Sequence, residues 1–380
     1  MRYLLALSFA FMWLSFPVPS AGADDPPPAS AAEKTWRVVY VEGGPYRDYH
    51  LIFLGLLQGL YELNLLSELP PLDEDENEDS SGFWQWLAEK SPGRGLEFPA
   101  DGFYSAAWDS SRLAEYKKEI MARGERGEVD LILAFGTAAG IALITDEHKI
   151  PILSISVTDP VAAGLSLSAE DSGRDNVHAQ VVVGAVEYQL AMFHNIFGFQ
   201  TLGLPSDSTP EGRRTMAIPT VEKIAAERGI TIVPCLADLE IEDLEESARN
   251  LKNCLEFLAP RSEAIYLPVN NGLQTEHMAG LLEPIIAHQR PSFSQTGPDD
   301  TEQGVLLSMG ETDFLNSGRF EAEVIKEIMG GATPRSLNQL YMPPLTMALN
   351  LKMARLIGWD PPFEVLAAMD ELYNKVAGRD

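Results

Sequence analysis

From Trp36 onward, short apolar runs alternate with longer amphipathic segments. Most of the short runs are nearly continuous in apolar residues, which is typical of parallel strands covered by helices on both faces. This alternation indicates βαβ units and predicts an α/β fold with two parallel sheets flanked by helices. We expect strands at 36–41, 129–135, 150–157, 201–204, 230–234, 264–267 and 304–309, and helices at 49–66, 138–144, 211–228, 242–258, 272–288 and 313–329.

The first residues have the pattern of a cleavable signal peptide. Arg2 precedes an apolar run too short to cross a bilayer, and Ala21-Gly22-Ala23 supplies small residues at a cleavage site. We therefore expect residues 1–23 to be removed and residues 24–34, rich in proline and alanine, to form a disordered tether. Asp24 would then be the first residue, where a lipoprotein needs cysteine. The sequence predicts a secreted periplasmic protein that is not lipidated.

The charge of the chain is strongly negative. Its 380 residues include 56 acidic and 28 basic ones, for a formal net charge of −28. Binding to nucleic acid is disfavoured, because a basic patch is needed to neutralise phosphates. Surface charge mainly reports solubility, so it gives no guide to the charge of a ligand. A mature chain of about 350 residues is longer than one hydrophobic core usually holds, so two domains are expected.

Two segments interrupt the alternation. The acidic run 73–79 fails as an EF-hand, since Glu78 and Trp84 stand where Gly and Glu are needed, and it is interpreted as a solvated loop. Residues 82–108 are rich in aromatic side chains. This segment either lines or covers a site, or forms a helix and hairpin packed on the first lobe, and the second interpretation is favoured.

Compact catalytic motifs are missing from the sequence. No phosphate-binding loop, dinucleotide fingerprint, zinc-protease motif, nucleophile elbow or C-x-x-C occurs, and the six histidines show no i, i+3 or i+4 pairing. We therefore expect no enzyme, no catalytic residue, no metal and no cofactor. The competing hypothesis is a secreted hydrolase that uses distant residues such as Asp159, His178 or His277.

The two cysteines, Cys235 and Cys254, allow two interpretations. In an oxidising compartment they are able to form a disulfide. Alternatively both are buried as small apolar residues, since Cys254 falls on the apolar stripe of a predicted helix.

Small polar residues follow several predicted strands, and open α/β sheets place their ligands at these carboxyl ends. Glu42 and Tyr46 flank Gly43-Gly44 after the first strand. Thr137 would sit at a helix N-terminus that suits a carboxylate, or would only cap that helix. Asp159 ends another strand, where it would hold a ligand ammonium group or merely cap the next turn.

The same segments resemble a known family. The stretches Ile132–Ala139, Val157–Leu165 and Gly304–Gly310, followed by Ile328–Pro334 and Asn350–Gly358, are similar in content and order to the ABC-transporter substrate-binding family often linked to aromatic amino acids. The resemblance covers most of the chain from Trp36 on.

This resemblance implies a type I periplasmic-binding-protein fold, with two Rossmann-like lobes and three hinge crossovers. The crossovers are expected near 160–180, 288 and 335. The expected lobes are 35–165 plus 289–334 for lobe 1, and 166–288 plus 335–380 for lobe 2.

The resemblance also implies a ligand site between the lobes. Family members usually carry Asp where Asn270 stands, so a negative anchor for an amino group is lost and a free amino acid becomes a weaker expectation. The expected ligand-binding residues are Glu42, Tyr46, Thr137, Ala138, Thr158, Asp159, Ser208, Thr209, Asn270, Asn271 and Gln295.

These observations predict a binding protein that closes over its ligand by hinge motion. The expected partners are a small-molecule ligand, an amino acid or a related small organic compound, and the membrane permease of an ABC importer. The chain is expected to be a monomer. The alternative is a periplasmic sensory subunit that signals to a membrane histidine kinase or chemoreceptor.

Overall fold

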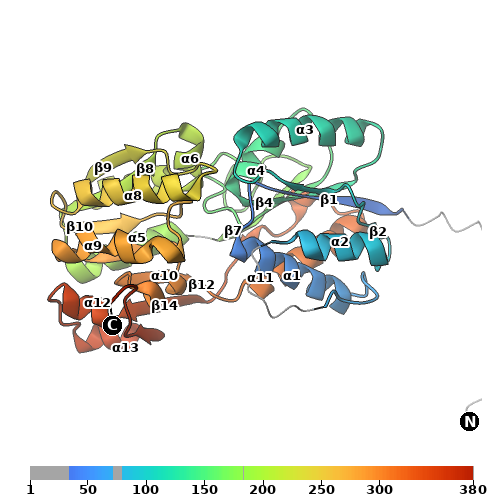
Figure 1. Cartoon of the computed structure of the whole chain (residues 1–380). Helices are drawn as coiled ribbons and strands as arrows, with labels where there is room; N and C mark the ends of the chain where they lie inside the picture. The colour runs from blue at the N-terminus through green and yellow to red at the C-terminus, as the bar shows by residue number, and fades with distance from the viewer. Residues whose placement is uncertain (1–33, 72–78, 183, 380) are drawn as a thin grey trace, which may run out of the picture. The chain divides into compact units, whose positions relative to one another are not determined.

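The computed structural model describes residues 34–71, 79–182 and 184–379. The predicted signal peptide, almost all of the tether and most of the acidic run lie outside these ranges. Within them the chain forms two large sheets and one small two-stranded sheet (Figure 1). The first sheet has the order β2-β1-β4-β5-β6, with β3 also on β1, and all its pairings are parallel. Its strands are β1 (Trp36–Glu42), β2 (Leu96–Glu97), β3 (Phe103–Ser105), β4 (Leu131–Phe135), β5 (Ile152–Ile155) and β6 (Val177–Ala179).

Helices cover both faces of the first sheet, as its continuous apolar strands predict. Along β1, Val38 and Tyr40 point into one core cluster, while Val39 and Val41 point into another. The first cluster is closed by α1 (Arg47–Glu62), α2 (Ser81–Lys90) and α11 (Phe314–Met329), and the second by α3 (Ser110–Glu125) and α4 (Gly136–Leu143).

The second sheet has the order β15-β14-β12-β11-β10-β8-β9 and is parallel except where β14 meets β12. Its side chains share one large core cluster. The strands are β8 (Thr201–Asp207), β9 (Thr231–Ala237), β10 (Ala264–Leu267), β11 (Ser292–Ser294), β12 (Leu307–Glu311), β14 (Leu345–Asn350) and β15 (Glu371–Tyr373). The helices that accompany it are α5 (Ala185–Phe197), α6 (Pro210–Thr215), α7 (Ile218–Glu227), α8 (Leu244–Leu258), η1 (Thr275–His277), α9 (Met278–Ala287), α10 (Pro298–Gln303), α12 (Leu351–Leu356) and α13 (Phe363–Ala368).

The chain passes between the two sheets three times. It leaves the first sheet after β6 through β7 (Val181–Val182), returns after β12 into α11, and leaves again through η2 (Pro334–Ser336) and β13 (Leu340–Tyr341). β7 and β13 pair in parallel, so the first and third passages run side by side.

The predicted position of the middle crossover, residue 288, is wrong. β11 and β12 continue the second sheet beside β10, so the crossing falls between Glu311 and Phe314. Likewise β6 lies in the first sheet, although residues 166–179 were expected in lobe 2. An apolar run shows that a strand is buried and does not show which sheet it joins.

The return passage is fixed by a close contact between α1 and α11. A Cβ atom on Gly55 would lie 2.6 Å from Cα of Leu315, and one on Gly318 would overlap the backbone of Leu56. Only glycine lets the two backbones approach this closely. The contact therefore packs α11, which follows the second-sheet strand β12, against the first sheet.

Every predicted strand overlaps an observed one, and every predicted helix overlaps an observed helix. The predicted helix 211–228 is split into α6 and α7, where Ala217 takes a left-handed φ of 52°. The helices α3, α5, α10, α12 and α13 and the strands β6, β7, β11, β13, β14 and β15 were not predicted. No helix in the described ranges is long and apolar enough to cross a membrane.

The aromatic segment 82–108 begins with the expected helix, α2, but contains no hairpin. β2 and β3 each pair in parallel with β1. Trp84 and Phe98 are buried in the core of the first sheet, which matches the favoured packing interpretation.

The two cysteines form a disulfide. Cys235 on β9 and Cys254 on α8 are joined with a Cα–Cα distance of 5.6 Å. Cys254 is also buried on the apolar face of α8, so both interpretations of this residue describe part of its environment. The bond ties the edge strand of the second sheet to the helix that covers it.

Candidate functional site

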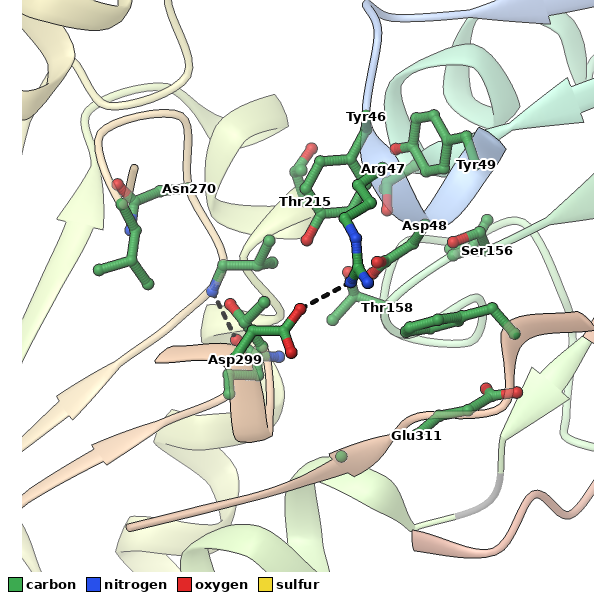
Figure 2. Close-up of a pocket in the computed structure, with 18 of the residues that line it drawn as sticks. Tyr46, Arg47, Asp48, Tyr49, Ser156, Thr158, Thr215, Asn270, Asp299 and Glu311 are labelled. Carbon is green, nitrogen blue, oxygen red and sulfur yellow. Dashed lines mark hydrogen bonds and ion pairs between the residues drawn. The ribbon is translucent and has the colours of Figure 1, made fainter. Parts of the chain in front are cut away.

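A cavity of about 360 Å³ lies at the carboxyl ends of strands from both sheets (Figure 2). Segments after β1, β4 and β5 line it from the first sheet, and segments after β10, β11 and β12 line it from the second. Open α/β sheets bind their ligands at this edge. The volume is in the range of small-molecule sites.

Four aromatic side chains, Tyr46, Tyr49, Trp108 and Phe314, line the cavity, and together we call them the aromatic wall. Tyr46 and Tyr49 meet edge to face with ring centroids 5.2 Å apart. Trp108 has a left-handed φ of 66°, a conformation that a large side chain rarely adopts. Such strain persists only where surrounding contacts enforce it.

Gly44 and Gly136 make room for two of these rings. A Cβ atom on Gly44 would lie 2.5 Å from the indole ring of Trp108. Gly136 has a φ of 81°, and the Tyr49 hydroxyl lies where its Cβ would stand. The lack of side chains at Gly43-Gly44, after the first strand, therefore lets the Trp108 ring pack against the backbone.

Carboxylates dominate the charged lining. Among the described residues, five acidic ones line the cavity, Asp48, Glu240, Asp299, Asp300 and Glu311, against one basic residue, Arg47. Arg47 Nη1 lies 2.6 Å from Asp299 Oδ2, so this positive charge is already paired (Figure 2). The ion pair joins α1 at the first sheet to α10 at the second.

Burial disfavours the charged form of these carboxyl groups. It raises the pKa of Asp48 and of Glu311 to about 7, and neighbouring acidic groups add to both shifts. Burial likewise raises the pKa of Glu240 to about 8 and that of Asp300 to about 6. These acidic groups are therefore partly protonated near neutral pH.

Two buried polar atoms at the cavity lack a hydrogen-bond partner within the described residues. They are Gln295 Nε2 and Glu240 Oε1. The other end of the Gln295 amide accepts a hydrogen bond from Val269 N at 3.0 Å, which fixes the side chain. Buried polar groups are normally satisfied, so such atoms are candidates for contact with a ligand.

Six of the predicted ligand-binding residues line the cavity. Asn270 is held locally, since its Nδ2 donates to Pro268 O at 2.8 Å and its Oδ1 accepts from Gly272 N at 3.0 Å. Thr137 lies in the first turn of α4, which begins at Gly136, so it is not the N-cap residue. The six are Tyr46, Thr137, Thr158, Asn270, Asn271 and Gln295.

The other five predicted residues lie outside the cavity lining, and four of them have other partners. Asp159 accepts hydrogen bonds from Ala162 N and from Thr220 Oγ1, so it caps its turn and contacts α7. Glu42 is buried and accepts from Tyr40 Oη at 2.7 Å. The exposed Ser208 donates to Asp238, and Thr209 caps α6. The fifth, Ala138, lies in α4 and packs against the core of the first sheet.

Several lining residues were missed by the sequence reasoning. Asp48 and Tyr49 follow Tyr46 in the first turn of α1. The rule that ligands bind at the carboxyl ends of strands would have found both if it had been applied three residues further along the chain. Glu311 ends β12, where the same rule applies. Trp108 ends the aromatic segment 82–108, for which lining a site was the less favoured interpretation. Glu240 lies well beyond the predicted strand 230–234, and no sequence signal pointed to it.

Among the residues that the structure describes, no group of three His, Cys, Asp or Glu side chains is placed to hold a metal ion.

The architecture and the position of the cavity define the type I periplasmic-binding-protein class, and solved structures agree. A conserved domain protein from Vibrio cholerae matches with a TM-score of 0.67 and 20% identity over 89% of this chain and 100% of that one. An ABC domain from Streptococcus pneumonia, in complex with L-Trp, matches with a TM-score of 0.65 and 17% identity over 89% and 100% of the two chains. At these identities the likeness establishes the fold.

Sequence comparison defines the family more narrowly. The model of the ABC transporter substrate binding protein family matches residues 82–372. The chain therefore belongs to the ABC transporter substrate-binding family. A search of curated proteins found no match.

Proposed function

We propose that this protein is a periplasmic solute-binding protein, which encloses a small organic ligand in the cavity and delivers it to an ABC importer. The observation that carries the proposal is the cavity itself, lined by strand ends of both sheets and large enough for a small molecule. Family membership and the lack of compact catalytic motifs in the sequence support binding without turnover.

Closure over the ligand is supported by contacts that span the two sheets at the rim of the cavity. Arg47 pairs with Asp299, and Asp159 accepts a hydrogen bond from Thr220. The strand pair β7–β13 lies on two of the three passages between the sheets and is the natural place for bending. A ligand that contacts both sides would favour the closed form.

The aromatic wall supports a ligand with a flat ring. The neighbour from Streptococcus pneumonia binds L-Trp, which has such a ring. Stacking and edge-to-face contacts with Tyr46, Tyr49 or Trp108 would bury the surface of such a ring and set its orientation.

Ligand binding is tested by thermal shift and calorimetry on residues 24–380, against amino acids, amines, aromatic acids, nucleosides and small peptides. A ligand that binds only the folded state raises the melting temperature. We expect one class to give a saturable shift that Trp108→Ala weakens at least tenfold, while Ser208→Ala, an exposed change outside the cavity, leaves it unchanged. Absence of any shift, or turnover of a compound, would contradict the proposal.

Delivery needs a separate experiment. Vesicles that carry the cognate permease and ATPase should take up radiolabelled ligand only when the binding protein is added. Binding without stimulated uptake would refute the transport step and leave ligand capture standing.

A further inference from the structure

We propose that the ligand is a small organic cation, an amine on an aromatic body without a free carboxylate, bound between Asp48, Glu240 and Glu311 and the aromatic wall. This proposal rests on the proposed function and names the ligand class of the same cavity. It starts from the charges around the cavity and from their partners.

The balance of charge in the cavity opposes an anionic group. Five carboxyl groups face one guanidinium, and that guanidinium is paired with Asp299. In the described part of the chain, no basic side chain forms an ion pair with Asp48, Glu240 or Glu311. A ligand carboxylate would therefore meet like charges, with no unpaired cation in the lining to compensate.

Of the four remaining carboxyl groups, Asp300 accepts a hydrogen bond from Ser294 Oγ, and the other three come from distant parts of the chain and act on a common space. Asp48 lies in α1, Glu240 follows β9 and Glu311 ends β12. The charge of Asp48 acts on Glu311, and both Asp48 and Glu240 act on Tyr49. A cation placed among them would satisfy groups that burial otherwise leaves costly to ionise.

Two further features of the site indicate a bound molecule. Gln295 is 7% exposed, lines the cavity and has an Nε2 donor without a partner, so the ligand is expected to carry a hydrogen-bond acceptor or a ring face there. Glu240 Oε1 is buried without a donor, which a ligand N–H would supply.

The aromatic wall fits the same ligand. Cations are attracted to the faces of Trp and Tyr rings, and a buried site strengthens this attraction. Tyr46, the N-cap residue of α1, and Tyr49 in its first turn flank Asp48 in the sequence, so aromatic rings and a carboxyl group lie near one another at this helix start (Figure 2).

One feature favours an anion, namely the N-terminus of α4, where Thr137 lines the cavity. The Tyr49 hydroxyl lies against Gly136 at this helix start. The helix end supplies a partial positive charge of about one half, which is small beside the excess of carboxyl groups.

Calorimetry with a matched ligand series tests the proposal directly. Phenethylamine, phenylalanine and 3-phenylpropionate share one ring and chain, and tryptamine, tryptophan and indole-3-propionate form a second set. In at least one set we expect the amine to bind at least tenfold more tightly than the amino acid, and the acid not to bind. Equal or tighter binding of the amino acid or the acid would overturn the proposal.

Other outcomes are also decisive. If neither set binds but a compound from the wider screen does, an aromatic amine without a carboxylate supports the proposal and any other compound overturns it. If nothing in the screen binds, the proposed function itself fails.

Charge-neutral variants give an independent readout. Glu311→Gln and Asp48→Asn should each weaken binding of the best cation at least tenfold at pH 8, while Glu256→Gln, on the exposed face of α8, should not. Calorimetry of wild-type protein at pH 7 in two buffers of different ionisation enthalpy should show proton release on binding. Unchanged affinity in both cavity variants, with their melting temperatures intact, would refute the role of these carboxylates.

Discussion

The disulfide between Cys235 and Cys254 gives the most quantitative prediction. The two residues are separated by 19 positions, so the bond closes a short loop from β9 through α8. In the chain-entropy model, a loop of this length removes about 11 cal/mol/K from the unfolded state, or about 3 kcal/mol at 25 °C. Reduction should therefore lower the free energy of unfolding of the second-sheet region by about this amount.

The assay is urea unfolding of residues 24–380 followed by circular dichroism, with and without a reducing agent. The oxidised and reduced wild-type proteins have the same side chains and differ only in the bond between the two sulfur atoms. The double variant Cys235→Ala/Cys254→Ala is the control, and it should lie within about 1 kcal/mol of reduced protein, the difference arising from the small cavity that the buried Cys254 sulfur leaves. A loss below about 1 kcal/mol on reduction would refute the entropic argument.

Three further predictions concern the cavity. Burial raises the pKa of Glu311 to about 7 from 4.5, so the folded, ligand-free protein binds more protons than the unfolded chain between these values. The stability that the Glu311 carboxyl group contributes is therefore present at pH 4 and is lost as the pH rises through 7. The melting temperature of Glu311→Gln should accordingly fall less between pH 5 and pH 8 than that of the wild-type protein. Gly44→Ala brings a methyl group to 2.5 Å from the Trp108 ring, so it should displace the ring and weaken ligand binding at least tenfold by calorimetry, while far-ultraviolet circular dichroism stays unchanged. Asp299→Asn removes an exposed ion pair with Arg47, which is worth about 1 kcal/mol or less, so ligand affinity should fall at most about fivefold and small-angle scattering of the ligand-free protein should shift toward the open form. A larger loss of affinity would mean that Asp299 contacts the ligand itself.

Part of the binding site followed from a simple rule. Parallel strands end at one edge of a sheet, and this placed Tyr46, Thr137 and Thr158 at the cavity. The same rule pointed to Asp159, and the family resemblance pointed to Ser208, but both lie outside the cavity lining. A short polar side chain at a strand end has local backbone and side-chain partners within reach, and only the folded chain decides which it takes.

The sequence by itself determined the alternation of strands and helices, because apolar periodicity records which positions are buried. It also determined the fold class and the family, since several motifs occur in the family's order. Tertiary structure decided that β11 and β12 join the second sheet and that Cys235 meets Cys254. It alone brought Asp48, Glu240 and Glu311 to one cavity. The physical reason is that periodicity reports burial, whereas partners and local charge depend on residues far apart in the chain that folding brings together.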